Sequence, residues 1–451
     1  MKDQFRSFVV RAITSEARKT LRRYSPKIIT VTGSVGKTSA KDAIYTALAG
    51  TLFVRKNDKS FNSEIGTPLT ILGLPNGWSN PVRWLLNIIQ GGWIAYGPLK
   101  FQKKYPEWLI LEVGADKPGD ISSIAKWLHP DIAVVTRIPD VPVHIEFFPS
   151  KEAVISEKSS IVKALKKKGS LILNADDENV LGIKLMLSPN TEQQVITFGF
   201  SERADIQGRD ARIQYDKDGR PEGVSFVASW KNVPETYVRH EQHLFVPGAL
   251  GSQHVYPLLV ALSVAYAQGV DMTKAAEQLS RHIPPKGRMN VIEGRNGSVI
   301  IDDSYNSSPV ASAEALSTLK EIKVPEGAKK IAILGDMMEL GQYSVAEHVK
   351  AGEQAADSAD IFIAVGIRAK GMAAAARGAR ADMEVYEMKD SMEAADMAKQ
   401  ILRDTPEEGS VVLVKGSQSM RMEKAAAILM ADPLDVHAKL VRQEPEWLAR
   451  V

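Results

Sequence analysis

The sequence predicts an α/β fold: a phosphate-binding central domain on a mainly parallel sheet, followed by a second, Rossmann-like α/β domain. Three observations support this prediction. A glycine-rich turn at residues 33–36 lies between a β-branched run and a helical pattern. Short apolar runs alternate with helical patterns from residue 28 to about 285, which is typical of parallel sheets covered by helices. A fresh α/β pattern begins after the proline-containing run 283–288.

Size and composition bound the class of protein. A chain of 451 residues exceeds the size at which single cores stop growing, so we expect several domains: a basic helix at 1–27, the central domain at 28–285 and the C-terminal domain at 286–451. The chain has no cysteine, which excludes disulfides, thiolate zinc sites and cysteine nucleophiles. A net charge of +3 is too small to indicate nucleic acid as a partner.

Apolar and β-branched runs predict the strands of both sheets. Residues 205–246 differ, because polar and apolar residues alternate around turn signals at 216–221, which predicts antiparallel hairpins. The strands predicted for the central sheet are 27–31, 108–113, 132–136, 170–174 and 194–198, and those for the second sheet are 298–302, 330–334, 360–365 and 410–414.

Two further segments carry apolar or basic surfaces. Residues 1–27 hold eight Lys/Arg against two Asp/Glu and lack the apolar core of a secretory signal. We interpret them as a helix that packs on its own domain; the alternative is a helix on an anionic membrane surface. The apolar run 84–96 is too short to span a bilayer and predicts a helical insertion, whose aromatic residues can also meet a partner or lipid. We expect a cytoplasmic monomer, at the inner face of the membrane if either segment binds lipid.

Residues 31–39 read VTGSVGKTS and predict a phosphate-binding loop. Glycines allow the backbone N–H groups to point inward, and the following helix adds a partial positive charge. Lys37 can reach the β- and γ-phosphates, and the Thr38 hydroxyl can bind Mg²⁺. Val31 stands where the general motif has a glycine, and the alternative is a turn that binds nothing. The predicted nucleotide contacts are Gly33, Ser34, Val35, Gly36, Lys37, Thr38 and Ser39.

Three more side chains are candidates for metal chemistry. Glu112 ends a predicted parallel strand and so faces the crevice where ligands bind, which suits Mg²⁺. His144 follows the strand 132–136, although a lone histidine is more often structural. Lys158 has no acidic neighbour one helical turn on; a buried lysine can lose its charge and react with CO₂ to a carbamate that ligates a second Mg²⁺.

The order of these motifs resembles that of the Mur ligases, from about residue 28 to about residue 430. The resemblance implies an ATP-dependent amide ligase, in which ATP converts a carboxylate to an acyl phosphate that an amine then attacks. The segments that resemble the family's central domain are 32–38, 62–66, 112–114, 144–146, Lys158 and 174–177, and those that resemble its C-terminal domain are 301–309, 334–341 and 415–417.

The resemblance also implies roles for individual residues. Thr38 and Glu112 would hold one Mg²⁺, and His144 with a carbamylated Lys158 would hold a second. The other implied contacts are Asn62 near the phosphates, His254, Arg288 and Asp303 at the nucleotide, and Asn306, Asp336, Glu339, Lys415 and Ser417 at the substrate, with Lys37, Asn62, His144 and Lys158 as the catalytic set.

The chain departs from the family pattern at three places. The phosphate loop starts at residue 33, so we expect the family's N-terminal UDP-binding domain to be missing. His254 stands where the family usually has asparagine beneath the adenine. Gln418 replaces the arginine that follows Lys-Gly-Ser and cannot pair with a carboxylate as arginine does; Arg421 lies one turn further on and is a candidate replacement.

Three functions follow. The first is a ligase of the branch that adds D-alanyl-D-alanine, or a similar amine, to a small-molecule or lipid-linked cell-wall peptide. The second is an amidating subunit that acts on a lipid-linked precursor with a glutaminase partner; the four-cysteine zinc insert of that branch is excluded by composition. The third is a nucleotide-dependent binding protein without ligase activity.

Overall fold

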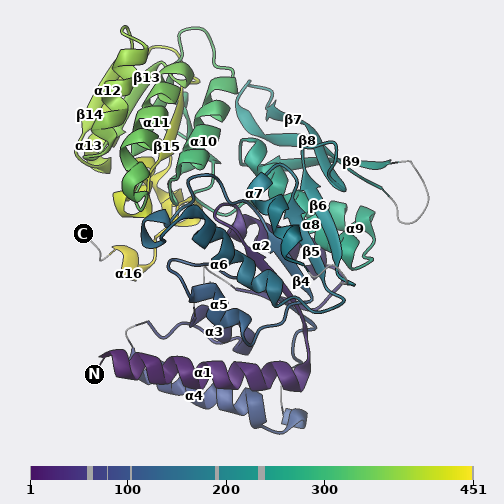
Figure 1. Cartoon of the computed structure of the whole chain (residues 1–451). Helices are drawn as coiled ribbons and strands as arrows, with labels where there is room; N and C mark the ends of the chain where they lie inside the picture. The colour runs from purple at the N-terminus through teal and green to yellow at the C-terminus, as the bar shows by residue number, and fades with distance from the viewer. Residues whose placement is uncertain are drawn as a thin grey trace.

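The computed structural model describes residues 2–57, 64–78, 80–101, 104–187, 192–231 and 239–448. Within these ranges, two β-sheets with helices on both faces make the two halves of the molecule (Figure 1). We call them the central half, with strands between residues 27 and 247, and the C-terminal half, with strands between residues 290 and 415. The predicted α/β fold with mainly parallel sheets is confirmed.

The central sheet has the strand order β2-β3-β1-β4-β5-β6-β7-β8-β9 over the described residues. Neighbouring strands from β2 to β7 are parallel. β8 is antiparallel to β7, and β9 is antiparallel to β8, which confirms the predicted hairpins. Because β1 lies between β3 and β4, the loops that follow these three strands meet at one edge of the sheet. The strands are β1 (Lys27–Thr32), β2 (Val54–Lys56), β3 (Trp108–Glu112), β4 (Ile132–Val135), β5 (Ser170–Asn174), β6 (Gln194–Gly199), β7 (Ile206–Tyr215), β8 (Pro221–Lys231) and β9 (Arg239–Pro247).

Helices cover both faces of the central sheet, because its strands are apolar on both sides. One face packs on α2 (Lys37–Ala49), α8 (Val255–Ala267) and α9 (Met272–Leu279). The other face packs on a larger group of helices: α3 (Gly66–Leu72), α5 (Asp120–Ala125), α6 (Lys151–Lys163) and α7 (Glu178–Leu181), to which α1 (Lys2–Tyr24) and α4 (Pro81–Tyr96) are joined.

The C-terminal sheet has the order β10-β11-β15-β12-β13-β14 over the described residues, and only β10 is antiparallel to its neighbour. Its helices again cover two faces. The elements are β10 (Asn290–Glu293), β11 (Val299–Asp303), α10 (Pro309–Glu321), β12 (Lys330–Gly335), α11 (Ser344–Ser358), β13 (Ile361–Val365), α12 (Ala369–Ala379), β14 (Glu384–Met388), α13 (Ser391–Asp404), β15 (Val411–Lys415), α14 (Glu423–Leu429), α15 (Val436–Lys439) and α16 (Pro445–Leu448).

The N-terminal basic helix packs on its own domain, which confirms the favoured interpretation. Val9, Ile13 and Ala17 of α1 are buried in the core that α3, α5 and α6 share. The predicted insertion is also confirmed as α4, which lies beside α1 at the end of the molecule away from the C-terminal sheet (Figure 1). No helix in the described ranges is long and apolar enough to cross a membrane.

The predicted strands are confirmed to within one residue at each end. Three short strands, β2, β10 and β14, were missed. β2 and β14 are edge strands, and β10 pairs antiparallel at the other edge. An edge strand buries less of its surface, so its apolar pattern is weaker. The domain boundaries at 28–285 and 286–451 stay predictions.

Candidate active site

The glycine loop between β1 and α2 is shaped by the end of β4. Gly33 and Gly36 have φ angles of 137° and 86°, in the left-handed region that favours glycine. A Cβ on Gly33 would lie 2.1 Å from Oγ1 of Thr136. The Thr136 hydroxyl instead donates to the Val35 carbonyl at 2.6 Å. The loop therefore requires glycine at position 33, and residues 34–39 line a cavity.

Glu112 and Thr38 meet at the floor of this cavity. Glu112 ends β3 in register with Val31 of β1 and is buried. The Thr38 hydroxyl donates to its Oε2 at 2.9 Å, and Asn57 Oδ1 accepts the Glu112 N–H at 3.1 Å. A hydroxyl and a carboxylate are oxygen ligands of the kind Mg²⁺ prefers. The pair therefore fits the first predicted metal site.

Cations from both halves surround the same space. Nζ of Lys37 donates to the Ser34 carbonyl at 3.2 Å. Burial lowers the pKa of Lys37, Glu112 raises it, and Arg288 of the C-terminal half lowers it again. Arg288 also lines the cavity, with its guanidinium carbon 4.2 Å from the ring centroid of Tyr305. Positive charge converging from two directions favours a polyanionic ligand.

Lys158 lies behind the loop. It is 2% exposed, and its Nζ donates to the Gly33 carbonyl at 3.0 Å. Burial, followed by the nearby Lys37, lowers the pKa of Lys158 to about 7. Lys158 is absent from the residues that line the cavity. Its amine therefore supports the loop rather than facing the ligand space.

His144 lines the cavity and contacts two carboxylates. Its Nδ1 lies 2.5 Å from Oε2 of Glu339, and its Nε2 lies 3.5 Å from Oδ1 of Asp116. The described part of the chain contains no group of three His, Asp or Glu side chains that could hold a metal. His144 and Lys158 thus each contact a protein group, and the second metal site expected from them stays a prediction. The sequence analysis missed the contact of Asp116 with His144. Nothing in the sequence pointed to Asp116 except its position in the loop after β3.

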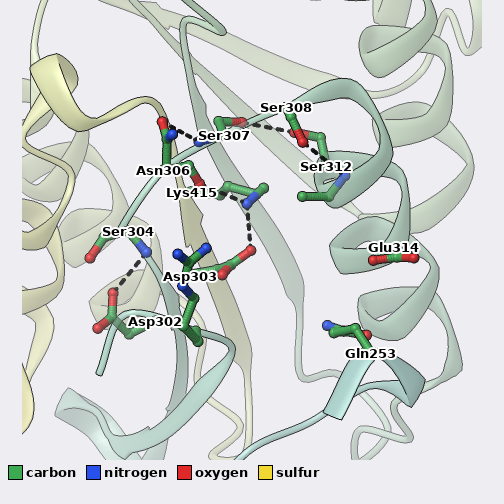
Figure 2. A network of polar contacts seen from close by, with 12 residues as sticks. Gln253, Asp302, Asp303, Ser304, Asn306, Ser307, Ser308, Ser312, Glu314 and Lys415 are labelled. Atoms are coloured by element: carbon green, nitrogen blue, oxygen red, sulfur yellow. Dashed lines mark hydrogen bonds and ion pairs between the residues drawn. The ribbon is translucent and has the colours of Figure 1, made fainter. Parts of the chain in front are cut away.

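Three residues of the C-terminal half converge at the ends of β11 and β15 (Figure 2). Asp303 and Lys415 are register partners, and Lys415 Nζ donates to Asp303 Oδ2 at 2.5 Å and to the Asn306 carbonyl at 3.0 Å. Lys415 is buried. The carboxylate of Asp303 balances its charge within the protein itself. All three predicted residues line the cavity.

The C-terminal segment after α14 forms another wall that the sequence analysis missed. Residues 440–447 line the cavity. Arg442 is buried, pairs with Glu423 Oε2 at 3.0 Å and donates to the carbonyls of Ser304 (3.1 Å) and Tyr305. Arg421, the candidate replacement for the family arginine, instead contacts Glu423 at 2.5 Å. A segment with a weak apolar pattern gives no sequence signal for such contacts.

The cavity is shared between the halves. It has a volume of about 1630 Å³ and is lined by residues of both sheets. Two contacts join the halves across it: an ion pair of Arg137, after β4, with Glu314 of α10, and the contact of His144 with Glu339. These contacts bring the phosphate loop and the Asp303 cluster to one site.

His254 contributes an unsatisfied nitrogen to this cavity. It is 4% exposed, lines the cavity, and its Nε2 has no hydrogen-bond partner among the described residues. Burial, followed by the nearby His282, lowers the pKa of His254 to about 4. The ring is therefore neutral near pH 7. A buried nitrogen that lacks a partner among the described residues favours a ligand group that can form a hydrogen bond with it.

The remaining predicted residues lie elsewhere. Asn62 is outside the described residues. Asp336 and Ser417 are not among the residues that line the cavity. The Asp336 side chain accepts from the Ala369 N–H at 2.8 Å, and Ser417 Oγ accepts from the Met338 N–H at 2.8 Å. Both therefore hold the loop that carries Glu339.

Together, the glycine loop on a parallel sheet and the second α/β half across a shared cavity define a two-part nucleotide-binding enzyme. Residues 98–265 match the Mur ligase middle domain, and residues 287–418 match the Mur ligase glutamate ligase domain. The chain belongs to the Mur ligase family and is an ATP-dependent carboxylate–amine ligase.

Relatives agree with this assignment, and solved structures share the fold. The chain is 28% identical to the UDP-N-acetylmuramoyl-tripeptide–D-alanyl-D-alanine ligase of Bacillus subtilis, over 94% of this chain and 80% of the relative. It is 24% identical to the Escherichia coli enzyme of the same name, over 89% and 76%. In fold it is similar to MurF from Acinetobacter baumannii (TM-score 0.73, 22% identity, 93% and 80% covered) and to MurF ligase from Thermotoga maritima in complex with ADP (0.70, 24%, 95% and 84%).

Proposed function

We propose that this chain adds D-alanyl-D-alanine to the peptide of a UDP-N-acetylmuramoyl precursor in peptidoglycan synthesis. The observation that carries the proposal is the similarity to ligases of that name along 94% of the chain. The shared cavity supports it, since loop residues 34–39 on one wall face Asp303, Asn306 and Lys415 on the other. A carboxylate and an amine can thus meet beside a nucleotide.

The proposed chemistry has two steps. The substrate carboxylate attacks the γ-phosphorus of ATP, which releases ADP and leaves an acyl phosphate. The amine nitrogen then attacks the acyl carbon, phosphate leaves, and the amine loses a proton. In the first step, Lys37, Arg288 and the loop N–H groups stabilise the negative charge of the transferring phosphoryl group.

Thr38 and Glu112 are the proposed holders of one Mg²⁺, which neutralises phosphate charge when bound. The geometry gives no support to a second ion. We propose that Lys158 works as a free amine that fixes the Gly33 carbonyl, and that carbamylation, expected from the resemblance, does not occur. For the nucleobase, we propose a hydrogen bond to Nε2 of His254, because that atom is buried and has no hydrogen-bond partner among the described residues.

The substrate wall is the second part of the proposal. Asn306, Glu339 and Lys415 line the cavity and are the proposed contacts of the peptide and the amine. Asp336 and Ser417 are proposed as positioning residues, because their side chains hold backbone N–H groups of neighbouring segments.

The experiment that tests the proposal measures phosphate release and product mass. The purified chain is incubated with ATP, Mg²⁺, the UDP-linked muramoyl tripeptide and D-alanyl-D-alanine. Parallel arms replace the dipeptide with ammonium or glutamine, and the UDP-linked acceptor with the same peptide free or lipid-linked. We expect product with the dipeptide on the UDP-linked acceptor and none with ammonium or glutamine. A comparable rate with the free peptide would show that uridine is not recognised. Product with ammonium on the lipid-linked acceptor would favour the amidating alternative, and no turnover in any arm would favour a binding protein.

Variants make the assay specific for the site. Glu112→Gln and Thr38→Ala remove a proposed metal ligand and should slow turnover about 10²- to 10³-fold. Glu107→Gln is the matched control, because Glu107 precedes the same strand and is exposed, with a surface partner in Lys104. Chelation of the metal should stop the wild-type reaction, and added Mg²⁺ should restore it. Equal rates for Glu112→Gln and Glu107→Gln would contradict the metal assignment.

A further inference from the structure

Helix α4 departs from the usual surface-helix pattern. A surface helix normally buries its apolar stripe and exposes its polar residues. In α4, the buried residues are Trp84 and three polar or small ones, Asn87, Gly91 and Ala95. Glu16 of α1 packs directly against Gly91. Apart from Trp84, the buried side of the helix is therefore small or polar, whereas large apolar side chains lie on its exposed side.

The exposed apolar side chains of α4 form one continuous stripe. Six of them are between 42% and 64% exposed. At 100° per residue they fall within an arc of about 100° on one side of the helix. They run the whole length of the helix, and none of the residues in α4 is acidic. The six are Val82, Leu85, Leu86, Ile89, Trp93 and Tyr96.

The sequence segments that contain α1 and α4 are rich in positive charge. Residues 1–27 and 81–105 hold twelve of the 57 Lys/Arg of the chain but only two of its 54 Asp/Glu. The rest of the chain is therefore net negative, so the charge of the molecule is strongly uneven. Arg18 and Arg22 of α1 are exposed, and Nζ of Lys19 lies 4.3 Å from the ring centroid of Tyr96 on the stripe.

We propose that α4 docks on an anionic membrane surface, with its apolar stripe in the headgroup region and the basic residues of α1 beside it. Helices that lie in a membrane interface combine such an apolar face with flanking Lys and Arg. Tryptophan and tyrosine, here Trp93 and Tyr96, are enriched at this depth. Each exposed cation adds attraction to anionic lipid.

The position of the helix fits a flat, extended target. α1 and α4 lie side by side along one end of the molecule, away from the C-terminal sheet (Figure 1). A second copy of this chain would place two strongly basic surfaces together, which charge repulsion opposes. A negatively charged lipid surface can bury the apolar stripe and also attract the cations beside it. The proposal does not depend on the reaction proposed above.

A vesicle flotation assay with the full-length chain tests the proposal. The vesicles contain phosphatidylcholine alone or phosphatidylcholine mixed with phosphatidylglycerol, at low and high salt. We expect binding to the mixed vesicles, at least about tenfold weaker binding to the neutral ones, and weakening by salt. In the variant Ile89→Gln/Trp93→Gln, binding to the mixed vesicles should fall by about tenfold or more.

Matched variants distinguish binding through α4 from nonspecific binding through other exposed apolar side chains. Leu185→Gln/Ile367→Gln removes two apolar side chains away from α4 that are even more exposed, and this variant should bind like wild type. Arg18→Gln/Arg22→Gln should weaken binding to the mixed vesicles only. Catalytic rates measured without lipid should match wild type for all three. The proposal is overturned if wild type does not float with the mixed vesicles, or if the α4 variant floats equally well. It is also overturned if the α4 substitutions instead abolish a dimer detected by sedimentation.

Discussion

Oε2 of Glu339 lies 2.5 Å from Nδ1 of His144, so a carboxylate of the C-terminal half contacts an imidazole of the central half. Both residues have left-handed backbone conformations, with φ of 64° and 67°. Such conformations cost free energy in residues other than glycine and persist where the surrounding structure fixes them. The contact lowers the pKa of Glu339 and ties the two walls of the cavity together.

This contact should help to hold the two halves of the molecule against each other. Glu339→Gln and His144→Ala should each lower kcat/KM, and the double variant should lose little more than either single one. A coupling free energy of about 0.5–1 kcal/mol is expected for a half-exposed pair. Small-angle scattering should show a larger radius of gyration for each single variant. Fully additive losses would indicate that the two side chains act independently.

Gly33→Ala should disrupt nucleotide binding. The new Cβ would meet Thr136 Oγ1 at 2.1 Å, in a backbone conformation that alanine rarely adopts. We expect a loss of about 1–3 kcal/mol in stability and weaker ATP binding, measured by thermal unfolding with and without nucleotide. Gly371→Ala is the control, because Gly371 lies in α12 with open space around its Cβ position, and it should be neutral or stabilising by up to about 1 kcal/mol.

Lys158 should be an unmodified lysine. Carbon-13 NMR of the active chain, equilibrated at neutral pH with carbon-13-labelled bicarbonate, should show no lysine carbamate signal. Lys158→Met should leave the Gly33 carbonyl without its donor, which costs about 1–3 kcal/mol, and should slow ATP turnover. Short-chain carboxylic acids should not restore the rate. Recovery with such an acid would show that an anionic group at position 158 is needed.

Arg442→Gln should destabilise the cavity wall. Arg442 and Glu423 are a buried pair, 4% and 1% exposed at their side chains. Removal of the Arg442 guanidinium leaves Glu423 with Arg421 as a remaining cation and leaves the carbonyls of Ser304 and Tyr305 without this donor. We expect a loss of about 1–3 kcal/mol. Arg377→Gln breaks an exposed pair with Glu387 and should cost at most about 1 kcal/mol. Equal losses in denaturant titrations would contradict the role of burial.

Packing between α1 and α4 should weaken as pH rises. Burial raises the pKa of Glu16 from 4.5 to about 7, and Lys19 opposes this only in part. Between these two values the unfolded chain has released a proton that the folded chain keeps, so stability falls with increasing pH across this window and is fully present below it. Above about pH 7, Glu16→Gln should raise the midpoint of thermal unfolding by about 2 °C, and near pH 5 by less. Glu277→Gln, on the surface of α9, is the control; a similar rise there would contradict this account.

Local sequence patterns were sufficient for most of the fold and for part of the site. Alternation of apolar runs located the parallel strands, and the glycine loop before Lys37 and Thr38 was recognisable because its chemistry lies within nine consecutive residues. Glu112 could be assigned to the same site, since parallel strands that neighbour each other end at one edge of the sheet. These inferences depend on backbone conformation and strand periodicity, which short stretches of sequence encode directly.

Other features were decided only by tertiary structure. The family resemblance implied that His144 and Lys158 share a metal, whereas packing turns His144 to Glu339 and Lys158 to the Gly33 carbonyl. The contact of Arg442 with residues 304 and 305 joins segments more than 130 positions apart. The outward direction of the apolar stripe on α4 depends on which face α1 covers. The sequence determines which groups exist and which elements carry them, whereas their partners depend on how distant elements pack, because burial and charge pairing are properties of the assembled core.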